Sequence, residues 1–265
     1  MAAERSRSVT VCLPARECAA TVGQVVSALV PLRAQGVLDE ILVVDAASRD
    51  GTAAIAAEAG ARVVQEGELM PSYGPPLGKG DAMWRALGVC EGELVCFLDA
   101  DTEAFSPHFA CGLIGALVCE PGVQLVKGFY RRPLGGAADG GGRVNHLLAR
   151  PALAVFHPEL AGVRQPLAGE VAASRELLER LPFVTGYGVE IAMLLDAWRA
   201  VGLAGLAQVD LDEHRNPHKS LAELEPMART VLATLAARLA AEGRLQDAPE
   251  GPVERPPLAS VAERV

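Results

Sequence analysis

Two carboxylates, one residue apart, end an apolar run near the middle of the chain. Residues 94–98 read Leu-Val-Cys-Phe-Leu, and Asp99 and Asp101 follow with Ala100 between them. Side chains alternate faces along a strand, so both carboxylates can face one cleft at the strand's carboxyl end. Such oxygens suit Mg²⁺ or Mn²⁺, which would in turn hold a diphosphate. The pattern favours a metal-dependent nucleotide-sugar site, although Asp-x-Asp taken alone is more often a solvated strand-end turn.

Two further residues could complete such a site. Lys79 lies between Gly78 and Gly80 at the start of a predicted helix, where free backbone N–H groups favour an anion. This is not a Walker loop, which needs Ser or Thr after the lysine. His214 follows a predicted strand and can join a carboxylate around a divalent cation. An ordinary helix start with a solvated lysine, and a surface histidine, are the alternative interpretations.

A glycine run followed by an arginine forms a third candidate. Gly140, Gly141, Gly142 and Arg143 together supply unhindered N–H groups, a cation and the start of a predicted helix. These are the usual parts of an anion-binding clamp. A glycine-rich stretch of this kind can also be a simple linker.

The elements that must position these residues alternate between strand and helix. We predict strands at 9–13, 40–45, 62–65 and 93–98, and helices at 19–33, 52–59 and 81–90. Such alternation indicates a parallel sheet with right-handed crossovers, whose ligands bind at the carboxyl ends of the strands. Polar residues gather at those ends, at 14–17, 45–51 and 99–101.

The second half is less regular. It predicts a strand at 123–130, a mobile glycine-rich loop at 135–142 and a helix from Arg143, then helices at 177–181, 189–201 and 221–239 and a strand at 206–211.

Composition excludes several classes of protein. The chain has 265 residues, half of them apolar, which is enough for a real core. A net charge of −9 argues against nucleic-acid partners, and no basic helix suggests a membrane surface. The six cysteines form no Cys-x-x-Cys pair, and neither an apolar leader region nor an 18-residue apolar stretch is evident. We therefore expect reduced thiols and a cytoplasmic enzyme.

Several segments, in order, resemble one family. The resemblance spans residues 9–240 and includes Leu13-Pro14-Ala15, Gly78-Lys79-Gly80, Leu98 to Asp101, the string Val126 to Leu134, Gln165-Pro166-Leu167, Gly186 to Glu190 and Glu213 to Asn216. These segments are similar to those of glucosyl-3-phosphoglycerate synthases, which are retaining glycosyltransferases. The resemblance implies an α/β GT-A (Rossmann-like) fold, with a mainly parallel central sheet flanked by helices and a smaller C-terminal acceptor-binding part. It implies transfer of glucose from UDP-glucose to 3-phosphoglycerate with Mg²⁺ or Mn²⁺, and a homodimer.

The same resemblance implies roles for individual residues. The metal ligands would be Asp101 and His214, and the catalytic groups would be Glu190, Lys79 and Leu167, the last through its backbone carbonyl. The nucleotide-sugar contacts would be Pro14, Ala15, Glu17, Asp45, Lys79, Asp99, Ala100 and Asp101. The acceptor contacts would be Gly142, Arg143, Val144, Asn145, Tyr187 and Asn216. The chain would divide into a disordered N-terminus (1–8), a nucleotide-sugar-binding half (9–134), an acceptor-binding half with the metal histidine (135–242) and a disordered tail (243–265).

Four departures from the family pattern leave alternatives open. Residues 16–19 and 45–48 differ where the family contacts uracil, so the base contacts are expected to be rearranged. Asn145 stands where the family has a threonine that helps bind the acceptor phosphate, and Asp212 stands where it has an arginine. A carboxylate near the acceptor disfavours a dianionic phosphate, so a neutral hydroxyl acceptor such as a nucleoside or secondary metabolite is a second hypothesis. A catalytically silent nucleotide-sugar binding protein is a third.

Overall fold

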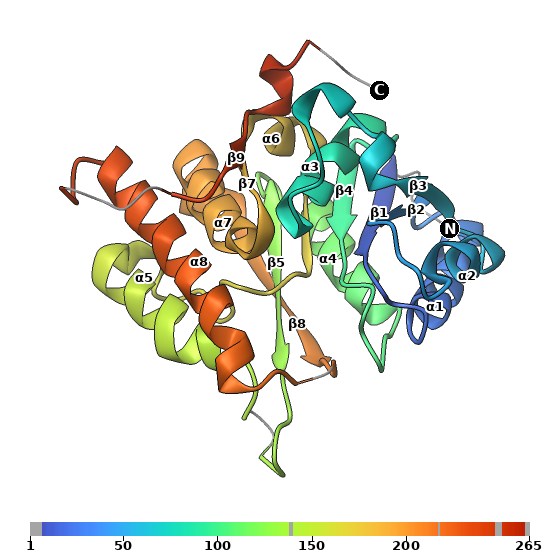
Figure 1. Ribbon diagram of the computed structural model, residues 1–265, viewed down its shortest axis with the longest axis horizontal. Coiled ribbons are helices and arrows are strands. Elements are labelled where there is room, and N and C mark those ends of the chain that lie inside the picture. The colour runs from blue at the N-terminus through green and yellow to red at the C-terminus, as the bar shows by residue number, and fades with distance from the viewer. Residues whose placement is uncertain (1–6, 138–139, 217, 247–250, 263–265) are drawn as a thin grey trace.

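A seven-stranded sheet runs through the molecule, with helices packed on both of its faces (Figure 1). The structure, a computed structural model, describes residues 7–137, 140–216, 218–246 and 251–262. The strands follow the order β3-β2-β1-β4-β6-β5-β8 across the sheet. In that order their bounds are Arg62–Gln65, Glu40–Asp45, Val9–Ala15, Leu94–Phe97, Val171–Ser174, Leu125–Arg131 and Leu206–Glu213.

The first half of the chain forms the alternation of strands and helices that the sequence predicts. β1 pairs in parallel with β2 and β4, and β2 pairs in parallel with β3. Every residue of β2 is buried, because helices cover both faces of a parallel sheet. The connecting helices α1, α2 and α3 span Val22–Ala34, Thr52–Glu58 and Lys79–Val89. The carboxyl ends of these strands therefore meet at one edge of the sheet.

β6 runs antiparallel to both of its neighbours, β4 and β5. We did not predict this strand, because its four residues, Val-Ala-Ala-Ser, include small side chains with weak strand preference. Its reversed direction brings its first residue, Val171, beside Phe97, the last residue of β4. The residue before it, Glu170, consequently reaches the same edge of the sheet as Asp99.

Apolar clusters hold the helices to the sheet and to one another. α1 and α4 (His108–Cys119) pack on one face, and α3, α6 (Arg175–Arg180) and α7 (Val189–Val201) pack on the other. α5 (Arg150–Phe156) and α8 (Leu221–Ala241) pack with α7 in a third cluster, at the left in Figure 1. We did not predict α4, because it contains no Asp, Glu, Lys or Arg to mark a polar face.

The expectation of a disordered tail is wrong for residues 251–262. Glu254–Arg255 form β9, which pairs with β7 (Phe183–Val184), and the Trp84 indole donates a hydrogen bond of 2.8 Å to the Pro256 carbonyl. Leu258 is fully buried in the cluster beneath α3 and α6. This segment stays ordered because apolar burial and a buried ion pair, described below, offset the entropy lost on ordering it.

Some sequence expectations fall outside the described residues. These are the disorder of residues 1–6, 247–250 and 263–265, and the mobility of residues 138–139 in the glycine-rich loop. Among the described residues, none of the helices combines the length and the apolar character that crossing a membrane requires.

Candidate active site

A cavity of about 900 Å³ opens at the edge of the sheet where the strand ends meet. Its walls come from both halves of the chain, because the loops after β1, β2 and β4 face those after β5 and β8. Most of the residues that the sequence singled out line it: Pro14, Ala15, Lys79, Asp99, Ala100, Asp101, Gly142, Arg143, Val144, Asn145, Leu167, Tyr187, Glu190 and Asn216. Its size suits a sugar nucleotide with a small second substrate.

Lys79 lies at the centre of an ion-pair cluster in this cavity. Its Nζ is 2.6 Å from Asp99 Oδ1, after β4, and 3.0 Å from Glu190 Oε1, in the first turn of α7. Burial acts to lower the pKa of Lys79, but the carboxylates of Asp99 and Glu190 outweigh burial and raise it well above its usual value. Lys79 is therefore a fixed cation at the start of α3, where the helix N-terminus also favours an anion.

His214 is held in a buried pocket beside this cluster. It is 2% exposed, its Nε2 lies 3.0 Å from Glu170 Oε1 and 3.1 Å from Thr102 Oγ1, and its ring stacks on Tyr130 at 4.6 Å. Burial acts to lower the pKa of His214, yet the Glu170 carboxylate raises it. These contacts fix the ring orientation and occupy Nε2.

Orphaned polar atoms here fit a divalent cation. Ligand atoms of Asp99, Glu170 and His214 all lie within 4.8 Å of one another. Within the described part of the chain, His214 Nδ1 and both Glu170 carboxylate oxygens lack a hydrogen-bond partner, although Glu170 Oε1 is within ion-pair range of the imidazole. Two carboxylates and an imidazole are a suitable donor set for Mg²⁺ or Mn²⁺.

Asp101, the expected metal ligand, lies outside that three-residue cluster but lines the same cavity. Asp101 is exposed to the open cavity, but the surrounding protein partly desolvates its carboxylate and raises its pKa, and the neighbouring Asp99 carboxylate adds to the shift. Asp99 already has Lys79 as its partner, whereas no described Lys, Arg or His lies within ion-pair distance of Asp101. A bound cation would therefore stabilise the ionised form of the Asp101 carboxylate.

One wall of the cavity is rich in basic side chains. Arg132, Arg143, His218 and Lys219 line it. Arg132 donates to the Asn216 side chain, and the Lys219 ammonium lies 3.2 Å from the Tyr187 hydroxyl. Such a wall suits an anionic substrate.

Two residues that were expected to contact the nucleotide sugar do not line the cavity. Glu17 is exposed, has a positive φ of 53° and accepts a hydrogen bond from Arg49 N. Asp45 is 1% exposed at the end of β2, where its Oδ2 accepts from Ser48 N. His214, the expected metal ligand, also lies behind the cavity wall rather than on it.

Asp212, on which the neutral-acceptor hypothesis rests, lies elsewhere. Its side chain is 79% exposed and lines a separate, smaller pocket of about 270 Å³. Asn145 does line the main cavity, but its Oδ1 accepts a hydrogen bond of 3.0 Å from Leu167 N and so supports the Leu167 backbone. The predicted like-charge repulsion near the acceptor is therefore absent from the described walls.

Three buried charged residues of the site were missed from sequence. Glu170 precedes the unpredicted strand β6, Lys127 lies within β5, and Glu66 follows β3. Lys127 donates to the Ala168 carbonyl, and burial lowers its pKa to about 8. A charged residue inside or beside an apolar strand is the signal that could have found the first two.

Comparison with known proteins gives a consistent picture. A family model described as glycosyl transferase family 2 matches residues 10–134. Glucosyl-3-phosphoglycerate synthase from Mycolicibacterium paratuberculosis is 43% identical, over 99% of this chain and 87% of that protein.

Two solved structures extend the match. Mannosyl-3-phosphoglycerate synthase from Rubrobacter xylanophilus has a TM-score of 0.92 at 44% identity, covering 97% of this chain and 91% of that one. Glucosyl-3-phosphoglycerate synthase from Mycobacterium tuberculosis, in complex with Mn²⁺, UDP-glucose and phosphoglyceric acid, has a TM-score of 0.85 at 41% identity, covering 96% and 91%. The identity and the coverage together show that this chain belongs to the glucosyl-3-phosphoglycerate synthase family of glycosyltransferases.

Proposed function

We propose that the protein transfers a glucosyl group from UDP-glucose to the hydroxyl of 3-phosphoglycerate, with Mg²⁺ or Mn²⁺ bound. One observation carries this proposal: a single cavity joins the Lys79, Asp99 and Glu190 cluster to a wall of cations. The first end suits a sugar diphosphate and the second an anionic acceptor. The relative from M. tuberculosis binds these two substrate classes with Mn²⁺, which supports the same assignment for this chain.

Asp101 and His214 would hold the metal ion in this proposal. His214 would offer Nδ1, because its Nε2 already faces Glu170 and Thr102. When bound, the ion would neutralise the charge that develops on the departing diphosphate. Glu170 would act as a positioning residue, since a carboxylate behind a ligating histidine fixes the tautomer and the ring.

The chain's own residues would supply the remaining chemistry. Lys79 would stabilise the diphosphate as the bond between the sugar C1 and the phosphate oxygen breaks. Asp99 and Glu190 would accept hydrogen bonds from sugar hydroxyls, and the Leu167 carbonyl would face the reacting carbon. The acceptor oxygen then bonds to C1 while its proton passes to the leaving phosphate oxygen. A retaining transfer of this kind needs no separate base.

Gly142, Arg143, Asn145, Tyr187 and Asn216 would bind the acceptor. Arg132 and Lys219 add positive charge beside them, which favours a phosphorylated acid. The neutral-acceptor version rested on Asp212 and Asn145. The exposed Asp212 side chain does not line the cavity, and Asn145 Oδ1 accepts a hydrogen bond from Leu167 N, so we retain the phosphorylated acceptor.

A matched pair of acceptors tests the proposal. Turnover of UDP-glucose with Mn²⁺ is measured with 3-phosphoglycerate and with glycerate, which differ by the phosphate group. We expect strong preference for 3-phosphoglycerate, and an Arg143→Met variant whose KM for it rises by about tenfold or more, as a lost charged contact predicts. The control is Arg229→Met, at an exposed position of α8, which should change neither constant.

Two outcomes would overturn the proposed glucosyl transfer to 3-phosphoglycerate. Equal turnover of glycerate would show that phosphate is not recognised, and Arg143→Met would then have no selective effect. Binding of UDP-glucose without transfer to either acceptor would support the silent binding protein instead.

A cytoplasmic location and a homodimer belong to the same proposal. Free thiols at all six cysteines support a reducing compartment. Sedimentation analysis of the full chain would test the dimer.

A further inference from the structure

A buried lysine behind the wall of the cavity has no role in the transfer described above. Lys127 lies in the middle of β5, where it is 2% exposed and does not line the cavity. Side chains alternate along a strand, so Lys127 lies on the same side of β5 as Leu125, which packs in the cluster that holds α3 and α7. These two helices carry Lys79 and Glu190. Lys127 therefore extends toward the side of the sheet that carries the ion-pair cluster.

The ammonium group of Lys127 is poorly compensated for a buried charge. Among the described residues, no carboxylate lies within ion-pair distance of its Nζ, and the acceptor that the structure gives it is the Ala168 carbonyl. Burial lowers the pKa of Lys127 to about 8, although the carboxylates of Glu190 and Glu170 act from farther away to raise it. Because burying an unpaired ammonium ion is costly, an apolar side chain of the same length would suit this strand better. The contact with the Ala168 carbonyl is what such a side chain could not make.

Ala168 belongs to the segment 167–170, which forms part of the cavity wall. Its neighbours Leu167 and Gly169 both line the cavity. Gly169 lies directly against Lys79, because a β-carbon built on the glycine would be 2.6 Å from the Lys79 Nζ. Ala168 itself is 1% exposed, and its carbonyl accepts the hydrogen bond from the buried lysine. A shift of this carbonyl would therefore move both neighbours relative to the site.

Two further hydrogen bonds anchor this segment, one on each side of the Lys127 contact. The Leu167 N–H donates a bond of 3.0 Å to Asn145 Oδ1, and the Glu170 carbonyl accepts a bond of 2.9 Å from Gly128 N. The Lys127 contact has a charged donor, which makes it stronger than a bond between neutral groups. Losing it would leave a buried carbonyl at the centre of the segment without this donor.

We propose that Lys127 is a positioning residue for glycosyl transfer, which holds the segment 167–170 against Lys79 by fixing the Ala168 carbonyl. Through this contact it sets where the Leu167 carbonyl faces the reacting carbon. The inference rests on the proposed function, which assigns the Leu167 carbonyl to the reacting centre. It deepens that function by naming a residue that touches neither substrate and yet controls the rate of transfer.

Lys127→Met tests the inference, because methionine has nearly the same length but neither the charge nor the N–H donors. We expect kcat for transfer from UDP-glucose to 3-phosphoglycerate to fall by about ten- to a hundredfold, as a displaced catalytic group predicts. The KM for UDP-glucose and the calorimetric Kd of UDP with Mn²⁺ should change by less than about threefold, because Lys127 does not line the cavity. Lys127→Arg keeps a charged N–H donor and should recover part of the lost kcat.

Leu125→Ala separates positioning from a general loss of stability. It removes packing from the same side of β5, where Leu125 is fully buried. At a temperature well below its Tm, this variant should keep the wild-type kcat although its Tm falls. A similar fall of kcat in Leu125→Ala and Lys127→Met would overturn the inference, because Lys127 would then act only through the stability of the fold.

Hydrogen exchange of the full-length protein reports on the segment without any transfer step. In Lys127→Met, peptides that cover residues 166–171 should exchange about tenfold faster or more, as the loss of one charged hydrogen bond predicts. Peptides from α1 should exchange at the wild-type rate, since that helix packs on the other face of the sheet.

The inference is also overturned if Lys127→Met keeps kcat within about twofold of the wild type, or if its 166–171 peptides exchange at wild-type rates. A failure of the proposed function would look different, because the wild-type protein itself would then transfer no glucose to 3-phosphoglycerate. In that case the exchange of the 166–171 peptides would still show whether Lys127 holds the segment in place.

Discussion

The charge of Lys79 is shared between carboxylates that lie far apart in the sequence. Asp99 follows β4 and Glu190 opens α7, and both point at the same ammonium group. Gly169, just before the buried Glu170, passes directly over this contact. A β-carbon built there would lie 2.5 Å from Asp99 Oδ1 and 2.6 Å from Lys79 Nζ, closer than atoms can approach. The ion pair therefore depends on the absence of a side chain at residue 169.

Replacing that glycine should impair both catalysis and stability. In Gly169→Ala, Lys79 and Asp99 must move apart, because the alanine methyl occupies their contact. We expect kcat to fall by about tenfold or more, while the free energy of unfolding falls by about 1–3 kcal/mol from overpacking. Steady-state kinetics and urea unfolding measure the two effects. Gly162→Ala, where nothing lies within 4 Å of the new methyl, is the control, and equal activity of both variants would contradict the assignment.

The raised pKa of Glu66 should make the free energy of unfolding depend on pH. Its folded pKa of about 7 lies above the value near 4.3 expected in the unfolded chain. The folded state therefore holds this proton longer, and its contribution is complete below about pH 4 and lost as the pH rises through 7. Glu66→Gln should be more stable than the wild type at pH 8, by of order 1–2 kcal/mol because the carboxyl faces an open cavity, and equal to it near pH 4.

Urea unfolding of both proteins at pH 4.5, 6 and 8 checks this difference. Other groups titrate in the same range, but they are common to both proteins and cancel. A stability difference that does not change with pH would mean that the Glu66 carboxyl has partners and an ordinary pKa.

Sequence reasoning picked out residues that line the cavity where those residues belong to a local motif. Lys79, Asp99 and Arg143 each sit at an element end that the sequence marks, and each lines the cavity. It missed Glu170, because only the reversed direction of β6 brings this residue to the site. It also expected Asp212 near the acceptor, since the sequence does not reveal that its backbone, at φ 64°, turns it away.

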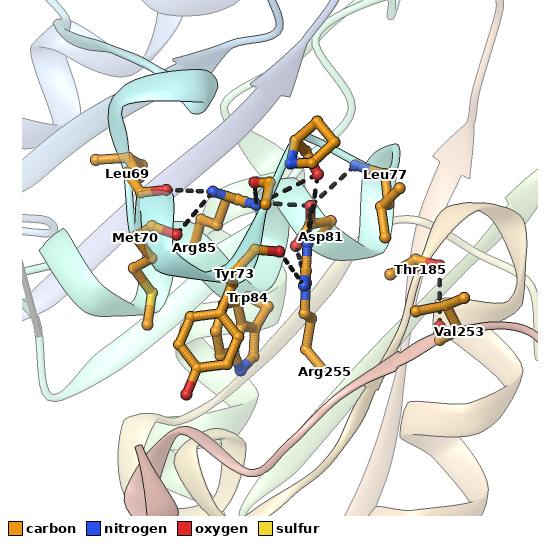
Figure 2. Close-up of polar contacts among 12 residues, drawn as sticks. Leu69, Met70, Tyr73, Leu77, Asp81, Trp84, Arg85, Thr185, Val253 and Arg255 are labelled. Atoms are coloured by element: carbon orange, nitrogen blue, oxygen red, sulfur yellow. Dashed lines mark hydrogen bonds and ion pairs between the residues drawn. The ribbon is translucent and has the colours of Figure 1, made fainter. Parts of the chain in front are cut away.

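At the scale of elements, the C-terminal strand β9 fastens the start of α3. Figure 2 shows Arg255 beside the buried Asp81. The Arg255 Nε lies 2.6 Å from Asp81 Oδ1, and its Nη2 lies 3.0 Å from Oδ2. Arg255 also donates to the Tyr73 carbonyl, and Arg85 binds the carbonyls of Leu69 and Met70. The two arginines thus hold the loop that leads into Gly78 and Lys79.

Removing this arginine should destabilise the protein and weaken donor binding. Arg255→Met leaves Asp81 buried with Arg85 as its remaining cation, so we expect a loss of about 2–3 kcal/mol in the free energy of unfolding. The KM for UDP-glucose should rise because the loop before Lys79 loses an anchor. Arg229→Met, which breaks an exposed pair on α8, should cost less than about 0.5 kcal/mol. If the two variants proved equally stable, β9 would not be fastening this loop.

Strong periodicity decided which elements could be predicted. The parallel strands and α1 to α3 follow clear patterns, and their bounds differ from the prediction by a few residues at most. The tail was taken as disordered because it is polar and rich in proline. The side chains that order it, Arg255 and Leu258, find their partners on α3 and in the core beneath it, and sequence proximity gives no sign of those contacts.

At the scale of the whole molecule, one sheet connects the two halves that the sequence separated at residue 134. β6 and β8 come from the second half, yet β6 is inserted between β4 and β5 and β8 pairs with β5. If the strands of one half unfolded, the paired strands of the other half would lose their backbone hydrogen-bond partners. The two walls of the cavity, one from each half, are therefore parts of one cooperative unit.

Two tryptophans make this cooperativity measurable. Trp84 is fully buried on α3 in the first half, and Trp198 lies on α7 in the second, 5.7 Å from His157 in edge-to-face contact. Trp84→Phe and Trp198→Phe each leave one fluorescent reporter. In each variant the urea midpoint by fluorescence should coincide with the midpoint by far-ultraviolet circular dichroism, as a two-state transition requires. Saturating UDP with Mn²⁺ should then raise both reporters' midpoints together, because ligand binding stabilises the whole native unit. A midpoint for Trp198 well below that for Trp84 would mean instead that the second half of the chain unfolds on its own, and that the shared sheet does not couple the two walls of the cavity.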